Sequence, residues 1–120
     1  MPNVHWVNVM GMHWCGFEDV DFAHRALFER TFNGVRQTLE EIESIEPLPC
    51  GGAVVVVRWA VDAYTSPSGQ AFAASRTRMS LTLVPGGDRQ LLVHGANIQI
   101  IEAAQRSDPV VRRPEREHGI

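Results

Sequence analysis

Residues 4–16 read VHWVNVMGMHWCG, and the rest of the chain is arranged around this stretch. Neighbouring residues of a β-strand project to opposite faces, and here large and small side chains alternate. One face would carry Trp6, Asn8, Met10 and Met12, and the other would carry His5, Val7, Val9 and His13. We therefore predict one strand over residues 4–16, which ends at Gly16, where the chain can turn.

Asn8 places an amide among apolar side chains on the first of these faces. A buried amide has to form hydrogen bonds, because leaving it unpaired costs free energy. Asn8 is therefore either a core residue whose hydrogen bonds are formed within the protein or part of a ligand pocket. The stretch alone leaves both interpretations open.

The composition is that of one globular domain. The chain has 120 residues, of which 44% are hydrophobic and 21% are charged, which is enough for a single core. The net charge of −3 gives no electrostatic reason to expect a nucleic acid or an anionic membrane as a partner. All basic residues are arginine, which excludes lysine Schiff-base chemistry. With no secretory signal and no long apolar run, we expect a cytoplasmic protein.

The two cysteines, Cys15 and Cys50, show neither a CxxC motif nor the spacing of metal ligands. Neither has a basic neighbour in the sequence that would activate its thiol. We expect two free, reduced thiols, no metal site and no cofactor.

A helix is predicted over residues 17–32, FEDVDFAHRALFERTF. Its apolar stripe has helical spacing and consists of Phe17, Val20, His24, Leu27, Phe28 and Thr31. Acidic residues in the first turn suit the helix dipole, and Asn33 with Gly34 ends the helix. His24 lies inside the stripe. It is either a core histidine with satisfied hydrogen bonds or a pocket histidine that is neutral at pH 7 and can act as a base.

Four strands are predicted after the helix. Residues 35–48 have an ambiguous periodicity, and we interpret them as a strand with a bulge between Glu40 and Glu41. The other strands are residues 53–64, 72–84 and 90–101, which short turns join into an antiparallel meander. Residues 103–120 are polar, rich in arginine and without periodicity. We predict a mobile or loosely docked tail there, which leaves residues 1–102 as the domain.

Four motifs carry a resemblance to a known family: VNVMGMHWCG (7–16), HRALFERTF (24–32), VRWAV (57–61) and LTLVPGGDRQLLVHGANIQI (81–100). Their order and spacing resemble those of the nuclear transport factor 2-like superfamily, which includes SnoaL-like polyketide cyclases and ketosteroid isomerases, and within it the SgcJ/EcaC branch. The resemblance implies an α+β fold in which a strongly curved antiparallel sheet of about five strands packs on a helix. This arrangement is a cone-shaped, cystatin-like or SnoaL-like α+β barrel.

The sequence departs from this family in three places. The family normally begins with one or two long helices that cap the cone, and here a strand is predicted from Val4, so we expect the N-terminal cap helices to be missing. The last strand of the branch normally ends in His-Asn-Thr, of which only Asn97 is present, between Ala96 and Ile98. Asn8 lies near the position of the isomerases' catalytic aspartate, and an amide cannot be a general base, so we do not expect steroid isomerisation.

The resemblance also implies a concave, mostly apolar cavity with a few polar groups, the usual form of a small-molecule site. The order of the elements then favours Asn8 as a pocket residue. The predicted ligand-binding residues are Trp6, Asn8, Met10, His24, Trp59, Arg78, Ser80 and Asn97. His24 is the candidate acid or base, with Asn8 or Asn97 orienting a carbonyl. Arg76 and Arg78 either receive a carboxylate or phosphate or belong to a solvated or dimer-contact face.

Two functions remain open from the sequence. The first is a small-molecule-binding domain, which includes a SnoaL-like enzyme acting on a small ligand with polar and apolar parts. The second is a non-catalytic dimerisation or protein-interaction module. An uncovered cone would expose more apolar area than soluble monomers tolerate. We therefore expect a homodimer in which the partner or the tail covers the opening. The sequence does not establish catalysis.

Overall fold

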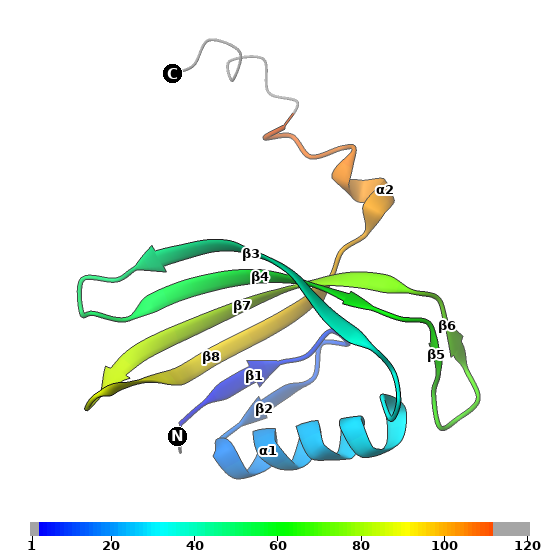
Figure 1. Cartoon of the computed structure of the whole chain (residues 1–120), viewed down its shortest axis with the longest axis horizontal. Coiled ribbons are helices and arrows are strands. Elements are labelled where there is room, and N and C mark those ends of the chain that lie inside the picture. The colour runs from blue at the N-terminus through cyan, green and yellow to red at the C-terminus, as the bar shows by residue number, and fades with distance from the viewer. Residues whose placement is uncertain (1–2, 112–120) are drawn as a thin grey trace.

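The computed structural model describes residues 3–111 and has an α+β fold in which a curved sheet arches over one helix (Figure 1). The main sheet has six strands in the order β2–β1–β8–β7–β4–β3, and β5 and β6 form a separate two-stranded sheet. In chain order the elements are β1 (His5–Val7), β2 (His13–Cys15), α1 (Phe17–Ala26), η1 (Leu27–Thr31), β3 (Gln37–Pro47), β4 (Ala53–Val61), β5 (Tyr64–Thr65), β6 (Ala71–Phe72), β7 (Ser75–Gly86), β8 (Arg89–Gln99) and α2 (Glu102–Gln105).

The first stretch is a β-hairpin, so the prediction of one strand over residues 4–16 was wrong. The side-chain Oδ1 of Asn8 accepts hydrogen bonds from the backbone N–H groups of Met10 (3.0 Å) and Met12 (2.8 Å), and Gly11 has a φ of 86°. Asparagine and glycine both favour such turns, and here they override the alternating pattern. The hairpin places Trp6 directly opposite Trp14, so both indoles lie on one face.

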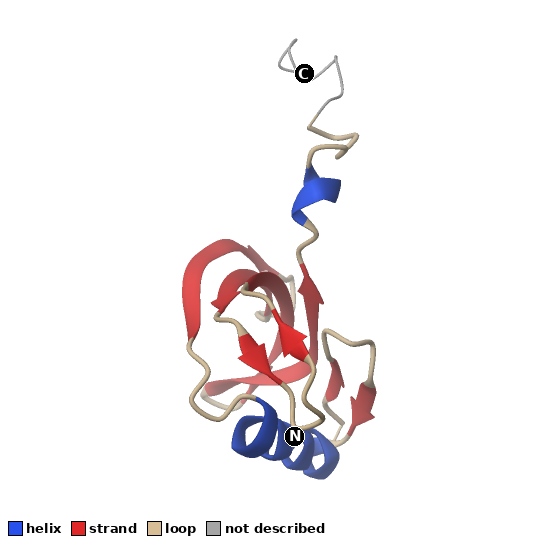
Figure 2. Cartoon of the chain, turned by 90° about the vertical axis from the view of Figure 1, so that its right-hand side faces the viewer, coloured by secondary structure: helices blue, strands red, loops and turns tan. Residues whose placement is uncertain are grey.

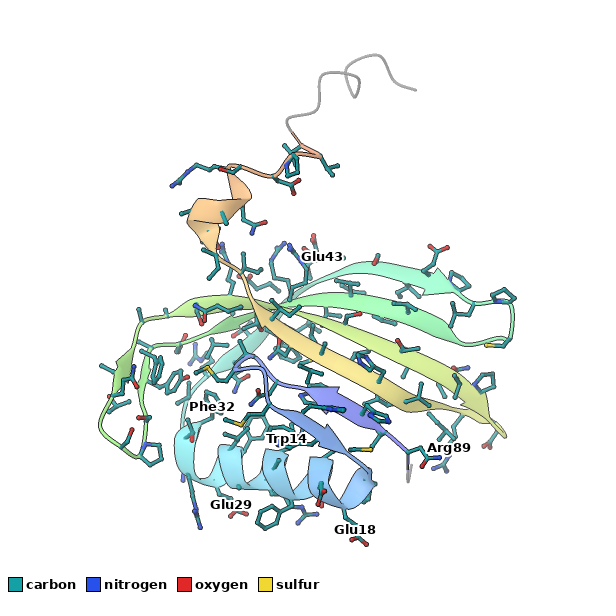
Figure 3. All side chains as sticks on the ribbon, turned by 180° about the vertical axis from the view of Figure 1, so that it is seen from behind. Trp14, Glu18, Glu29, Phe32, Glu43 and Arg89 are labelled. Carbon is teal, nitrogen blue, oxygen red and sulfur yellow. The ribbon has the colours of Figure 1, made fainter. Side chains whose placement is uncertain are left out.

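The predicted helix is confirmed, with a change of winding inside it. Ten residues form α1, and the next five form η1, a segment with π-helical hydrogen bonds. A π segment adds one residue to a turn, and such segments are frequent at functional sites. Figure 3 shows Glu18 and Glu29 on the side of the helix that faces away from the sheet. Phe17, which the helical stripe assigned to the covered side, is 54% exposed.

The bulge predicted in the first long strand is confirmed, since the pairing of β3 with β4 shifts register between Leu39 and Glu41. A second shift lies between Ile42 and Ser44. Each bulge turns an additional residue toward the same face. Three glutamates of β3 consequently reach the outer face of the sheet, where each forms an ion pair with Arg58; they are Glu40, Glu41 and Glu43.

The antiparallel meander is also confirmed, because β4 pairs with β7 and β7 with β8 in antiparallel fashion. The sheet as a whole is mixed, since β1 lies parallel to β8. In Figure 2 the strands curl over α1. The sheet is open within the described residues, where β2 and β3 are its two edges, so the closed cone or barrel is not confirmed.

The core of this fold is small. Among residues 3–111, the buried apolar side chains are Val4, Trp6, Val57 and Val61, and Thr77 is buried with them. Residues 103–111 are mostly exposed, and in Figure 1 this part of the chain runs away from the sheet. Whether residues 103–120 are mobile stays a prediction, and residues 112–120 lie outside the described part. Among residues 3–111, no helix is long and apolar enough to cross a membrane.

We expect Gly95→Ala to destabilise the fold by about 1–3 kcal/mol, the usual cost of overpacking a core site. A Cβ at this position would overlap the six-membered ring of Trp6, a rigid and buried neighbour. Urea unfolding followed by circular dichroism measures the change. Gly86→Ala is the matched control, because its Cβ would overlap Cδ1 and Cγ of Leu91, a flexible and partly exposed side chain, instead of a rigid buried ring. Equal costs for the two variants would contradict this account of Trp6.

Candidate functional site

A groove of about 380 Å³ lies between the concave face of the main sheet, the β1–β2 hairpin and the helix, and the β5–β6 hairpin forms one of its ends. Trp14 and Phe32 point into the space between the helix and the sheet (Figure 3). The volume is within the range of small-molecule sites. None of the described residues that line the groove is an aspartate, glutamate, lysine or arginine.

The floor of the groove contains polar groups without a partner in the protein. Thr77 and Asn97 line the groove, and Trp59 lies opposite Thr77 on the neighbouring strand. The Trp59 Nε1, Thr77 Oγ1 and Asn97 Oδ1 atoms are all buried and form no hydrogen bond within the described residues. Buried polar atoms are nearly always hydrogen-bonded in native proteins, so unpaired ones call for an explanation. Here three of them occur on adjacent strands of one face.

His24 is held in a fixed orientation above this floor. Its Nδ1 is 2.8 Å from the carbonyl oxygen of Val20, so this nitrogen donates a proton to the carbonyl. In the neutral ring the Nε2 atom then carries the lone pair. The ring meets Trp6 edge-on at 4.8 Å and Trp14 at 5.8 Å between centroids. His24 therefore has a satisfied structural hydrogen bond and also lines the groove, which combines the two interpretations left open by the sequence.

Asn8 likewise has a structural role and a place in the groove lining. Its side-chain oxygen is occupied by the two hydrogen bonds that form the hairpin turn. The amide nitrogen is the part of this side chain that remains to donate to a ligand.

An aromatic wall at the end of the groove was missed by the sequence analysis. The Tyr64 ring lies 4.9 Å from Phe32 and stacks on Phe72 at 5.0 Å between centroids. Burial raises the pKa of the Tyr64 phenol, so it remains neutral at physiological pH. The residues between Tyr64 and Phe72 read as a plain hairpin loop, and nothing in their pattern indicates that the loop folds against the helix.

The structure brings five of the eight predicted ligand-binding residues to the groove lining, namely Trp6, Asn8, Met10, His24 and Asn97. Trp59 lies beside the lining, on the same face of the sheet. A ligand-binding role for these residues stays a prediction.

Arg78 and Ser80 require a correction, because they lie on the opposite face of β7 from Thr77 and outside the groove. The Arg78 guanidinium binds Glu43 through Nε (2.6 Å to Oε1) and Nη2 (3.0 Å to Oε2). This hydrogen bond is the largest reason why the pKa of Glu43 is lowered. Arg76 is likewise paired, with Glu40 at 3.0 Å. Of the two interpretations of these arginines, the structure supports the solvated outer face.

A wider hollow of about 560 Å³ lies near the start of β7, lined in part by Glu40, Arg76 and Glu102. These charges pair with one another, with Arg76 lying 3.8 Å from Glu102. We therefore regard the aromatic groove as the better site. Within residues 3–111, no three His, Cys, Asp or Glu side chains are placed to hold a metal ion.

Solved structures share this fold along nearly the whole chain. A protein with a cystatin-like fold from Caulobacter vibrioides is 34% identical, with a TM-score of 0.87 over 93% of this chain and 78% of that one. A nuclear transport factor 2-like superfamily protein from Salmonella enterica is 16% identical, with a TM-score of 0.67 over 83% of this chain and 70% of that one. Aln2 from a Streptomyces species is 19% identical, with a TM-score of 0.65 over 93% and 74% of the two chains.

The chain has the fold of the nuclear transport factor 2-like superfamily. No protein-family model matches the sequence, and no curated protein is similar to it. This shared fold confirms the predicted resemblance and the α+β architecture, whereas the SgcJ/EcaC branch stays a prediction.

We expect Asn8→Ala to lower the free energy of unfolding by about 1–2 kcal/mol, because two backbone N–H groups lose their acceptor. Asn8→Asp keeps both acceptor positions and should restore most of the stability. Thermal unfolding of the three proteins tests this. If the aspartate variant were as unstable as the alanine variant, the hairpin turn would not depend on these hydrogen bonds.

Proposed function

We propose that this protein is a small-molecule-binding domain whose ligand occupies the aromatic groove. The observation that carries the proposal is the unpaired polar atoms of Thr77 and Asn97 in the lining of a mostly apolar groove, with the unpaired Nε1 of Trp59 beside them on the neighbouring strand. A ligand that hydrogen-bonds these atoms would recover the free energy lost by burying them unpaired.

The same atoms indicate the chemical class of the ligand. The Trp59 Nε1–H group donates, the Asn97 Oδ1 atom accepts, and the Thr77 hydroxyl does both. A hydroxyl or a primary amide matches this set, because each both donates and accepts hydrogen bonds. None of the described lining residues is an aspartate, glutamate, lysine or arginine that would pair with an ionised group. The aromatic wall suits a flat apolar body. We therefore infer a neutral ligand with an apolar body and one polar end.

His24 is the groove side chain best suited to take up a proton, because its Nε2 atom carries the free lone pair. We retain it as the candidate acid or base of a SnoaL-like reaction. Binding alone accounts for the polar floor, so the proposed function does not require catalysis.

The proposal predicts that Thr77→Val weakens ligand binding without destabilising the free protein. Removing an unpaired buried hydroxyl should leave the free energy of unfolding unchanged or raise it by up to about 1 kcal/mol. Naphthalene-2-carboxamide, a neutral flat probe, should lose about tenfold in affinity, the equivalent of one hydrogen bond. Isothermal titration calorimetry measures this loss.

Two controls accompany this experiment. Ser80→Ala changes a hydroxyl on the opposite face of the same strand and should leave the affinity unchanged. Naphthalene-2-carboxylate has the same shape as the amide with a negative charge, and it should bind more weakly than the amide. The proposed groove site would be refuted if neither probe bound, or if the Ser80 and Thr77 variants lost affinity equally.

We also propose that two copies of the chain associate, the second function considered from the sequence. On the edge strand β3, Leu39, Ile42 and Ile45 are 46%, 54% and 61% exposed. An exposed apolar edge strand is prone to pair with another chain.

Sedimentation equilibrium at tens of micromolar should therefore give about twice the chain mass of 13.4 kDa. Ile42→Arg should shift the protein to a monomer, because it places a charge in the apolar row of β3. Ser44→Arg is the matched control on the same strand, since Ser44 lies opposite Val56, on the outer face. A monomeric wild-type protein would exclude the proposed association.

A further inference from the structure

A second cluster of reactive side chains lies on the face of the β1–β2 hairpin that points away from the groove. His5 and Cys15 face each other across the two strands, and His13 is the next residue of β2 on that face. The Cys15 Sγ atom is 3.7 Å from Nε2 of His5, and Nδ1 of His5 is 3.0 Å from Nε2 of His13. The two imidazole rings are inclined by only 20°.

These contacts define one direction of proton donation. If the Cys15 thiol donates to Nε2 of His5, then His5 carries its own proton on Nδ1 and donates it to Nε2 of His13. All three side chains are neutral in this arrangement, and each hydrogen bond has one donor and one acceptor. The two nitrogens of His5 point toward different partners, so a single metal ion cannot bind all three side chains in this geometry.

A thiol, an adjacent base and a third group that orients the base form the arrangement that activates cysteine nucleophiles. Proton transfer to His5 would produce a thiolate beside an imidazolium whose other N–H group is held by His13. Cys15 is free and exposed, so a reagent in solution can reach it.

The second cysteine lacks these partners. Cys50 is also free and exposed, but it lies in the turn between β3 and β4, and no hydrogen bond joins it to an imidazole among the described residues. The chain therefore contains one thiol beside an imidazole and one reference thiol, and both are exposed. His94, which lies beside His5 on β8, provides a comparable internal reference for the imidazoles.

We propose that Cys15, His5 and His13 form a thiol-exchange site that reacts with small disulfides. His5 takes the thiol proton on Nε2, and the Cys15 sulfur attacks one sulfur of the disulfide. A Cys15–sulfur bond forms as the disulfide bond breaks, and the leaving thiolate takes the proton back from His5. The exchange needs no further oxidant, because the disulfide reagent supplies the oxidised sulfur atoms. His13 acts through His5 and is a positioning residue.

The product is a mixed disulfide that can be removed by an external thiol. Cys15 and Cys50 form no disulfide with each other. Cys15 would thus be a site of reversible modification by small thiols, on the hairpin face opposite the groove. This inference is independent of the small-molecule function proposed above.

The test uses the two single-cysteine proteins, Cys50→Ser and Cys15→Ser, with dithiodipyridine as a neutral disulfide whose released thione is followed by absorbance. We expect Cys15 to react about tenfold faster than Cys50 or more, as for a thiol assisted by a base. In urea, where the hairpin is unfolded, the two rates should become equal. Equal rates in the folded proteins would overturn the proposal.

Ring replacements in the Cys50→Ser protein identify the base. His5→Phe keeps a flat ring without nitrogens, and it should reduce the rate of Cys15 to that of Cys50. His13→Phe should cause a partial loss, and His94→Phe, the matched control, should change the rate less than twofold. Melting temperatures are recorded for each variant, because a loss of rate with an unchanged melting temperature is not structural. An unchanged rate in a folded His5→Phe variant would overturn the assignment of the base.

Discussion

The packing of the Trp6 indole onto Gly95 is the contact on which this structure depends most. Trp6 is 7% exposed, and a side chain larger than hydrogen at position 95 would overlap its ring. The contact sits where β1 pairs in parallel with β8, so it joins the N-terminal hairpin to the meander. Because few other side chains are buried in the described residues, a large share of the apolar stabilisation depends on this one ring.

This position of the hairpin gives its two faces different environments. Trp6 and Trp14 on one face enclose His24 and form part of the groove wall. His5 and Cys15, which neighbour Trp6 and Trp14 in the sequence, project to the opposite face, which points away from the groove. The pairing of β1 with β2 thus produces both an apolar groove wall and a polar cluster, because neighbouring residues of a strand project to opposite faces.

The outer face of the sheet is stabilised differently from the inner face. Bulges in β3 direct Glu40 and Glu43 toward Arg58 and Arg78, which satisfies the charges of that face. Exposed ion pairs of this kind contribute little to stability. The inner face, by contrast, contains unpaired polar atoms at its floor. The ligand site that we propose would account for these unpaired atoms in a protein with so small a core.

The sequence by itself determined the order of the helix and the long strands, the turn at Gly34 and the bulge at Glu40, because periodicity and turn chemistry act between near neighbours. It also indicated five residues of the groove lining, Trp6, Asn8, Met10, His24 and Asn97. It did not determine that Asn8 forms a turn or that Arg78 lies outside the groove. Only the tertiary structure decided these points, and it also placed His5 beside Cys15 and Tyr64 against Phe32. Alternation shows which residues share a face, but the register between distant segments and the packing of the helix decide which face is covered.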